Sequence, residues 1–326
     1  MSNLLKFYQI NSFTTKPLTG NPAGVILCQE TWPENIQKIA SEINQNETAF
    51  ILPIKNSNSN FEENAFKVDK KFKLRWLTPT CEVPLCGHAT LAAASVLFEV
   101  CKNENQVLEF ETLSGILKAE RDDKNNNTGI ILDFPADVPV ALEDLDSINH
   151  IIPYVINPII PACGDFDCID DVNQIKLGRK TRKLIVELNS SSKNLSKLLD
   201  MAVPDPKELT SLHDGSLFKG ICFTMRNPNI IYKNSKHDII SRYFAPWNGL
   251  DEDHVTGSLH TTLAPFYMED EDKRRELGKS NPNDRISARQ CSPRNGEMFV
   301  EWDDEKGRVF LIGRCCHVIE GVMNVG

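Results

Sequence analysis

The sequence lacks any long apolar run. No stretch approaches the roughly 18 consecutive apolar residues that a membrane-spanning helix needs, so we expect no membrane partner. The first residues, Met1–Phe7, also lack a basic region followed by a long apolar segment. Because a secretory signal needs both, we expect a cytoplasmic protein.

Clustered positive charge is missing as well. Asp and Glu number 45 against 36 Lys and Arg, which gives a net charge of −9. A nucleic-acid surface needs gathered Lys and Arg to contact phosphates. The one basic run, Lys176–Lys183, is interpreted as a solvated turn that leads into a strand. We therefore expect no nucleic-acid partner.

Cysteine is too sparse for a disulfide framework. Ten cysteines in 326 residues are few for a scaffold of that kind, and a cytoplasmic setting would keep them reduced. Cys315-Cys316-His317 has no second pair at ligand spacing. Neighbouring side chains on a strand also point to opposite faces, so we expect no metal site.

One motif occurs twice, about 170 residues apart. Arg75–Pro79 is followed by Pro84–Ala92, and Arg242–Pro246 is followed by Asp253–Thr261. Both copies have an Arg, two large hydrophobic residues, a small residue and a Pro, then a Gly with a polar residue behind it. The repeat and the length predict two similar domains, 1–125 and 126–326, an arrangement that allows the last strands to return to the first domain.

Short strands bounded by turns are typical of both halves. The predicted strands are Leu4–Ile10, Gly24–Cys28, Ala49–Pro53, Phe72–Leu77, Val107–Thr112, Gly129–Phe134, Leu184–Leu188, Gly220–Arg226, Glu297–Trp302 and Arg308–Gly313. The first predicted helix has an apolar stripe through Ile36 and Ile43, with Pro33 at its start. A second, almost wholly apolar helix begins at Gly87, and its counterpart at Gly257 is expected to end near Pro265. The pattern predicts an α+β fold in which a mostly antiparallel sheet surrounds a buried helix, twice.

Each Gly-polar step could open a helix. The first N–H groups of a helix have no partner within it and favour anions. If Gly87-His88 and Gly257-Ser258 face each other across a domain cleft, they would hold a small, carboxylated molecule. The simpler alternative is that each Gly permits a turn and that His88 and Ser258 are ordinary N-caps. Because the step is repeated, we favour the functional interpretation.

Two acidic residues are candidates for proton transfer. Glu47 precedes the apolar strand that begins at Ala49, where partial burial would raise the pKa of its carboxyl toward neutrality. Asp253 precedes Ser258 by five residues, within the acidic run 251–253, two members of which are interpreted as surface charges. Spacing alone also allows both candidates to be solvent-exposed.

Several segments together resemble the phenazine-biosynthesis PhzF-like isomerase family. They are Phe13-Thr14, Gly20–Val25, Asn46–Phe50, Pro84–Thr90, Glu111–Gly115, Asp253–His260 and Gln290–Arg294. Their order and spacing match over nearly the whole chain. The resemblance implies the diaminopimelate-epimerase-like fold, with two similar β-barrel domains, a central helix in each and the active site between them. It also suggests a homodimer.

The resemblance also implies roles for individual residues. Glu47 matches the catalytic acid/base, which moves a proton on a small cyclic amino-hydroxy acid. His88, Asp253 and Ser258 match its supporting polar residues, and the steps at Gly87 and Gly257 match the backbone that holds the substrate carboxylate. No metal and no organic cofactor is implied. The sequence departs from the family pattern near the pocket, at His254, Leu259 and Asn295, which concerns the substrate more than the chemistry.

Two other functions fit parts of the sequence. Cys86-Gly87-His88 resembles the first thiol motif of proline racemases and diaminopimelate epimerases, which use two thiols. The repeat places Thr256 at the position of the second thiol, and its hydroxyl is too weak an acid, so Cys86 is interpreted as a buried small residue. The third alternative is a binding protein that keeps the fold without catalysis.

Overall fold

The structure is a computed structural model, and it describes residues 4–54, 65–123, 129–142, 159–163, 170–226 and 236–325. The chain divides into two compact units. Unit 1 contains Met1–Phe134 and Phe310–Gly326, and unit 2 contains Pro135–Val309. The sequence predicts a division at residues 125 and 126, whereas the structure divides at 134 and 135 and returns to unit 1 near the end of the chain.

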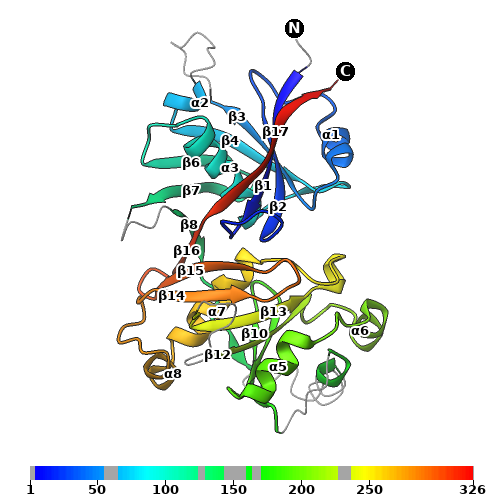
Figure 1. Ribbon diagram of the computed structural model, residues 1–326, viewed down its shortest axis with the longest axis vertical. Coiled ribbons are helices and arrows are strands. Elements are labelled where there is room, and N and C mark those ends of the chain that lie inside the picture. Colours follow the sequence, from blue (N-terminus) through cyan, green and yellow to red (C-terminus); the bar gives the residue numbers. More distant parts are fainter. Residues whose placement is uncertain are drawn as a thin grey trace. The chain divides into compact units, whose positions relative to one another are not determined.

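Unit 1 combines strands with a few helices (Figure 1). Its strands are β1 (Leu4–Ser12), β2 (Asn21–Leu27), β3 (Thr48–Pro53), β4 (Lys71–Leu77), β5 (Glu82–Val83), β6 (Val107–Thr112), β7 (Gly115–Asp122), β8 (Gly129–Pro135) and β17 (Cys315–Asn324). Its helices are α1 (Ile36–Ile43), α2 (Ala65–Val68) and α3 (Gly87–Ser95), which continues as a π-turn over Val96–Val100. The strand β16 (Arg308–Gly313) crosses the division between the units.

Unit 2 has the same kinds of element. Its strands are β9 (Val140–Ala141), β10 (Val172–Gly178), β11 (Lys183–Leu188), β12 (Gly220–Arg226), β13 (Ile239–Phe244), β14 (Ile286–Gln290) and β15 (Gly296–Asp303). Its helices are α5 (Ser192–Asp200), α6 (Pro206–Leu212), a 3₁₀ turn (Pro246–Asn248), α7 (Gly257–Met268) and α8 (Glu271–Glu276).

Strand pairing follows one order in both units. In unit 1, β1–β2 is antiparallel, β2–β3 parallel, β3–β4 antiparallel, β4–β6 parallel and β6–β7 antiparallel. In unit 2, the strands β10 to β15 pair in the same alternation. This shared order supports the interpretation of the chain as two copies of one domain.

The parallel pairs explain why α3 and α7 correspond. Parallel neighbours need a crossover connection, usually a helix, whereas antiparallel neighbours need only a turn. The crossover from β4 to β6 contains α3, and the crossover from β13 to β14 contains α7. The two helix starts recognised in the sequence therefore occupy equivalent places in the two units.

Helix α3 is buried in unit 1. Every residue from His88 to Ser95 is buried, and the helix packs against β1, β2 and β3. A helix that is apolar on all sides belongs in a core, which is what its run of Ala and Leu predicts. The expectation of a buried central helix is confirmed for this unit.

Helix α7 continues beyond the predicted end. It was expected to stop near Pro265, but it extends to Met268 with Pro265 inside. A proline in a helix lacks the N–H that would bond the carbonyl four residues earlier. That carbonyl, on Thr261, accepts the N–H of Asp137 instead, at 3.2 Å. The prediction was wrong because a segment distant in the sequence supplies the missing donor.

Helix α1 also differs from its prediction. Pro33 was expected at the start, but Asn35 is the N-cap and the helix begins at Ile36. The first helical hydrogen bond runs from the N–H of Ile39 to the carbonyl of Asn35, so Pro33 precedes the helix. The apolar stripe is confirmed, since Ile39 is buried in the small core under α1.

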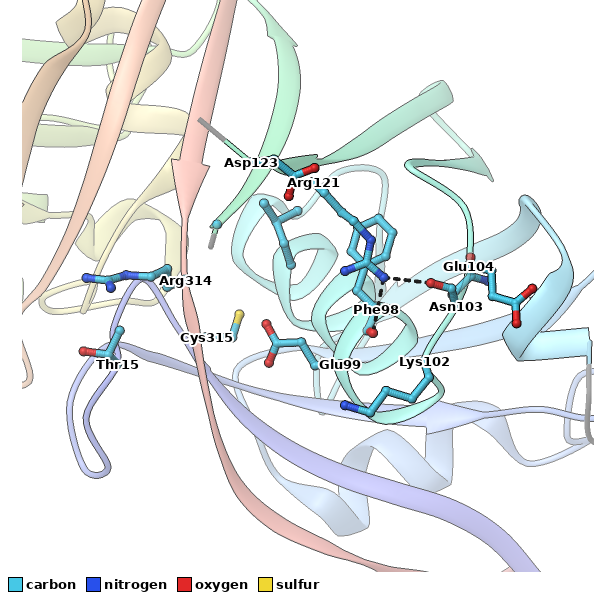
Figure 2. A pocket seen from close by; sticks show the side chains of 12 residues that line it. Thr15, Phe98, Glu99, Lys102, Asn103, Glu104, Arg121, Asp123, Arg314 and Cys315 are labelled. Carbon is cyan, nitrogen blue, oxygen red and sulfur yellow. Dashed lines mark hydrogen bonds between the residues drawn. The ribbon is translucent and has the colours of Figure 1, made fainter. Parts of the chain in front are cut away.

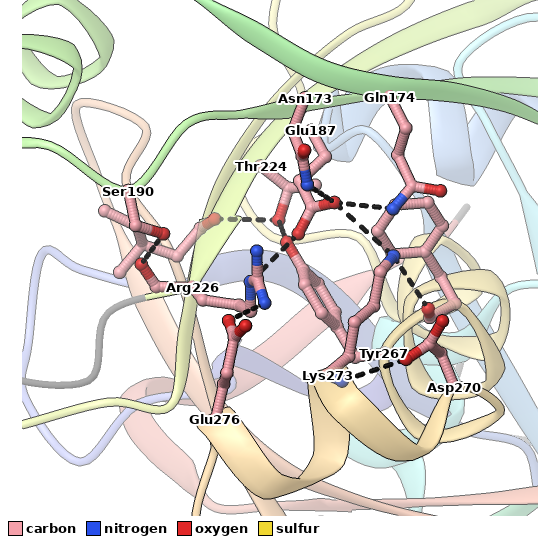
Figure 3. Close-up of polar contacts among 12 residues, drawn as sticks. Asn173, Gln174, Glu187, Ser190, Thr224, Arg226, Tyr267, Asp270, Lys273 and Glu276 are labelled. Atoms are coloured by element: carbon pink, nitrogen blue, oxygen red, sulfur yellow. Dashed lines mark hydrogen bonds and ion pairs between the residues drawn. The ribbon is translucent and has the colours of Figure 1, made fainter.

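A buried charge network anchors α8 in unit 2 (Figure 3). Glu187 of β11 has no exposed surface, and its carboxylate lies 3.2 Å from Arg226 and 3.4 Å from Lys273. The side-chain amides of Asn173 and Gln174 donate to it as well. Burial lowers the pKa of Lys273 to about 8, although Glu187 acts in the opposite direction. The network ties α8 to strands β11 and β12.

The basic run 176–183 is not the solvated turn that was expected. Lys176 lies in β10, and Lys183 is buried at the start of β11, so only the residues between the two strands form a turn. Within the described residues, no helix is long and apolar enough to cross a membrane.

Candidate active site

The first turn of α3 provides the frame of the site in unit 1. The helix begins at Gly87, and Cys86 is the N-cap in an extended conformation without a side-chain capping bond. In unit 2, α7 begins at Gly257 with Thr256 in the same role. Both glycines thus open helices as predicted, and neither His88 nor Ser258 is an N-cap. The simpler interpretation of those two residues is therefore wrong.

Glu47 lies against this helix start. It stands just before β3, and its carbonyl accepts the N–H of Gly24, which extends the parallel pairing of β2 and β3. Its carboxylate Oε2 lies 3.2 Å from Nε2 of His88. The Ser12 hydroxyl donates to the His88 carbonyl at 2.7 Å and fixes the backbone of that turn. The structure therefore brings together the two polar residues predicted for unit 1.

The charge state of Glu47 differs from the prediction. Burial alone would raise its pKa, as expected, but the neighbouring His88 cation outweighs burial, and the pKa of Glu47 lies below its ordinary value. Burial would lower the pKa of His88, yet the Glu47 carboxylate and the hydrogen bond with Cys86 outweigh burial and raise that pKa well above its usual value. The pair therefore rests as carboxylate and imidazolium.

The helix dipole makes the His88 charge depend on Glu47. The positive end of a helix dipole disfavours a cation in the first turn and favours a carboxylate there. His88 is the second residue of α3. Its imidazolium therefore needs the Glu47 carboxylate beside it, and the two charges form one unit.

Cys86 completes a buried cluster on the other side of the imidazole. Its Sγ lies 3.5 Å from Nδ1 of His88, and burial raises the pKa of the thiol, so it is neutral at ordinary pH. Donor atoms of Glu47, Cys86 and His88 lie within 4.8 Å of one another, as the ligands of a metal ion would. However, the carboxylate faces one ring nitrogen of His88 and the thiol faces the other. This arrangement suits proton transfer better than a shared ion.

The second helix start carries a hydrogen-bond network around Asp253. The Thr256 hydroxyl donates to the Asp253 carboxylate at 2.6 Å, and His260 Nδ1 donates to the Thr256 carbonyl at 2.8 Å. Burial lowers the pKa of His260 to about 4, so this histidine is uncharged. Ser258 is exposed at the first turn of α7. The structure thus places Asp253 and Ser258 at the same helix start, while the expectation of one pocket shared with Gly87-His88 stays a prediction.

Sequence reasoning missed an ion pair in each repeat. Arg75 makes a bidentate pair with Glu82, with bonds of 2.8 and 2.6 Å, and Arg242 makes one with Glu252, with two bonds of 2.8 Å. The repeated arginines were visible, but their partners stand at different spacings. Two of residues 251–253 were interpreted as surface charges; Asp251 is exposed, but Glu252 is buried in this pair.

A separate cavity lies near the other end of α3 (Figure 2). It has a volume of about 750 Å³ and is lined from unit 1 by Phe98, Glu99, Arg121 and Arg314, among others. Arg121 lies over the Phe98 ring and donates to the Asn103 carbonyl at 2.7 Å. None of the predicted site residues lines this cavity.

Sequence comparisons place the chain among known proteins. A family model described as phenazine biosynthesis-like protein matches residues 10–321. A phenazine biosynthesis-like domain-containing protein from Bos taurus is 37% identical over 321 residues, which cover 98% of this chain and 99% of the relative. An uncharacterized isomerase from Pseudomonas aeruginosa is 32% identical over 319 residues, 97% of each chain.

Solved structures show the same fold. A phenazine biosynthesis protein of the PhzF family from Enterococcus faecalis has a TM-score of 0.71 at 27% identity and covers 99% of both chains. A hydroxyproline epimerase from Agrobacterium vitis, at 11% identity, shares the fold with a TM-score of 0.51, over 100% of this chain and 94% of that one. The α+β, diaminopimelate-epimerase-like fold is thereby confirmed, and the chain belongs to the PhzC-PhzF family of phenazine biosynthesis-like proteins.

Proposed function

We propose that this protein is a cofactor-independent isomerase that moves a proton on a small carboxylate-bearing substrate, with Glu47 as general acid/base. The observation that carries the proposal is the contact between partly buried Glu47 and buried His88 at the first turn of α3. Isomerase function is also the activity named for a relative at 32% identity. A proton acceptor and an anion-binding helix start are the two parts that such a reaction needs.

The proposed reaction uses the resting charges directly. The substrate carboxylate binds at the N–H groups of the first turn of α3, beside the His88 cation. The Glu47 carboxylate removes a proton from a carbon of the substrate, and the electrons of the broken C–H bond move into the substrate's π-system. Glu47, now a carboxylic acid, returns the proton to another carbon. The substrate gains and loses nothing overall, so no oxidant or reductant is required.

His88 has two proposed tasks in this cycle. Its positive charge holds Glu47 ionised before proton removal and stabilises negative charge that develops on the substrate. When Glu47 becomes protonated, the imidazolium loses its counter-charge, which favours return of the proton. Asp253 and Ser258 are proposed to support the same reaction from unit 2.

The two-thiol alternative has less support. A racemase of that kind needs a reactive thiol at both helix starts, and Thr256 stands at the second one. The Cys86 thiol is neutral at ordinary pH, because burial raises its pKa. A neutral thiol is a weak nucleophile and a weak base. A binding protein without turnover is the other alternative, and only an activity measurement separates it from an isomerase.

The test is deuterium incorporation from solvent. A panel of small carboxylic acids that carry amino and hydroxyl groups is incubated in D₂O with wild type or Glu47→Gln, and deuterium in each compound is followed by mass spectrometry. We expect wild type to label at least one compound and Glu47→Gln to be slower by about 10²- to 10⁴-fold, because the amide cannot carry the proton. Equal labelling by both proteins would exclude Glu47 as the acid/base.

A double variant tests whether unit 2 takes part. If Glu47 and Asp253 serve one reaction, the losses in Glu47→Gln and Asp253→Asn should combine non-additively in the double variant. Losses that multiply would assign Asp253 a separate role. Labelling of no compound by wild type would favour the binding protein.

A further inference from the structure

The segment from Asp253 to Thr256 has no regular secondary structure, although it carries a proposed catalytic residue and leads into α7. One backbone bond ties it to the neighbouring strand β13, from the N–H of Asp253 to the Tyr243 carbonyl at 3.1 Å. Side chains also hold this segment in place and so restrict its backbone freedom. Two of those side chains come from the end of β14 and the turn after it.

Gln290 makes three contacts to this segment. Its Oε1 accepts the N–H of Thr256 at 2.8 Å, while its Nε2 donates to the Asp253 carbonyl at 2.7 Å and to the Thr256 hydroxyl oxygen at 3.3 Å. The side chain has no exposed surface. Rotating the amide by 180° would set donor against donor and acceptor against acceptor, so its orientation is fixed.

These contacts set the direction of the Thr256 hydroxyl. Because Gln290 donates to the Thr256 oxygen, the hydroxyl hydrogen is left to point elsewhere, and it donates to Oδ2 of Asp253 at 2.6 Å. A chain of donors therefore runs from Gln290 through Thr256 to the Asp253 carboxylate. It fixes the position of that carboxylate relative to the first turn of α7.

Ser292 binds the next carbonyl of the segment, that of His254. Its hydroxyl accepts the N–H of Asn295 at 3.0 Å and donates to the His254 carbonyl at 2.7 Å. Ser292 is buried like Gln290. Consecutive carbonyls, of Asp253 and His254, are thus each bound by a side chain from the segment 290–292.

We propose that Gln290 and Ser292 are positioning residues that hold residues 253–256 and thereby orient Asp253 for the reaction. The assignment rests on the proposed function for the role of Asp253, and on the hydrogen bonds above for the positioning itself. A positioning role explains why buried positions 290 and 292 carry polar residues, since a hydrophobic residue of similar size could not make these hydrogen bonds.

The variant Gln290→Glu removes the donor atom of this side chain and keeps its acceptor atom. The new side chain keeps an oxygen for the Thr256 N–H but replaces the donor Nε2, so the Thr256 hydroxyl can turn toward residue 290 and away from Asp253. Thr256→Val removes the hydroxyl at similar volume, and Thr256→Ser restores it. Gln106→Glu is the matched control, because exposed Gln106 donates in the same way to the Arg121 carbonyl and the Asp123 carboxylate in unit 1.

The first readout needs no substrate. In hydrogen–deuterium exchange, we expect amides within residues 250–260 to exchange at least about tenfold faster in Gln290→Glu and Thr256→Val, because charge-assisted bonds of this kind slow opening by that order. Thr256→Ser and Gln106→Glu should exchange like wild type. Unchanged exchange in Gln290→Glu and in Thr256→Val would overturn the proposal.

The second readout separates positioning from general support of the fold. With the panel compound that wild type labels, kcat should fall about 10²-fold in Gln290→Glu and Thr256→Val while KM changes little, since misplacement of a reacting group acts on the chemical step. Recovery of kcat in Thr256→Ser is expected. A fall of kcat that merely follows the loss of folded protein would overturn the role in positioning. If wild type labels no panel compound, the proposed function fails. The exchange data still decide whether the Gln290 side chain holds the segment 253–256 in place.

Discussion

The two repeats share a backbone but differ in the charges they carry. At the start of α3, a buried imidazolium lies 3.2 Å from the partly buried carboxylate of Glu47. At the start of α7, a threonine, a glutamine and an uncharged histidine form a network around Asp253. The equivalent crossover helices therefore begin beside a carboxylate and an imidazolium in unit 1, and beside a carboxylate with uncharged partners in unit 2.

The arginine–glutamate ion pairs differ in burial in the opposite direction, because the pair in unit 2 is the more buried one. The side chains of Arg75 and Glu82 in unit 1 are 30% and 26% exposed, whereas those of Arg242 and Glu252 in unit 2 are 4% and 5% exposed. Arg242 also donates to the Leu198 and Met201 carbonyls. In unit 1 the Glu47–His88 pair is thus less exposed than the arginine pair, whereas in unit 2 the arginine pair is almost fully buried. Equivalent positions in a repeat need not contribute equally to stability or to chemistry.

The largest difference between the two units is expected in the free energy of unfolding of variants that lack one of these arginines. Arg242→Met leaves Glu252 buried without its cation, and we expect a loss of about 3–5 kcal/mol in the free energy of unfolding. Arg75→Met should cost about 1 kcal/mol or less, because water can solvate Glu82. Urea unfolding of both variants measures this. Equal losses would mean that burial does not distinguish the two pairs.

A smaller and pH-dependent effect is expected at the helix starts. Glu47 has a pKa below its ordinary 4.5, so its contribution to stability is present above pH 4.5 and lost as pH falls through the lowered value. His88 has a pKa above its ordinary 6.5, so its contribution is complete below pH 6.5 and lost as pH rises through the raised value. The advantage of wild type over His88→Gln should therefore be greatest between these two values, at about 1.5–3 kcal/mol.

Ser258→Ala is the control for this pH dependence. Its side chain does not titrate and is exposed, so its effect on unfolding should be the same at every pH. An advantage of His88 that grows above pH 6.5 would contradict the charge states assigned to the pair.

The smallest effect is expected from Cys86→Ser. The change gives α3 a hydroxyl at its N-cap, as α7 has at Thr256, and serine is a favourable N-cap residue. We expect deuterium labelling by this variant to stay within about tenfold of wild type, because Cys86 carries no proton in the proposed reaction. Abolished labelling would assign the chemistry to the thiol instead.

The sequence predicted much of the fold but not all its strands. All ten predicted strands overlap observed ones, because each has a compact run of apolar residues bounded by turns. Strand β17 was missed because its residues are mostly exposed, and it is held by pairing with β1 rather than by an apolar face. Strand β13 was missed although its start at Ile239 is apolar, since buried Arg242 interrupts the pattern.

The candidate site was located from the sequence, but its electrostatics were not. Glu47 and His88 were both identified, yet their contact spans 41 residues and no spacing rule reveals it. Without that contact, burial alone predicts a raised pKa for Glu47, which is the wrong direction. The contacts of Gln290 were hidden for the same reason, because they join β14 to a segment 34 residues or more away.

The pairing of β1 with β17 has a consequence for the order in which the protein can form. Leu4 lies opposite Asn324, so two strands of unit 1 come from the two ends of the described chain. Unit 2 is contiguous in sequence and precedes β17. During synthesis, which proceeds from the N-terminus, all of unit 2 is made before β1 can meet its second neighbour. Unit 1, which carries Glu47, is therefore begun first and completed last.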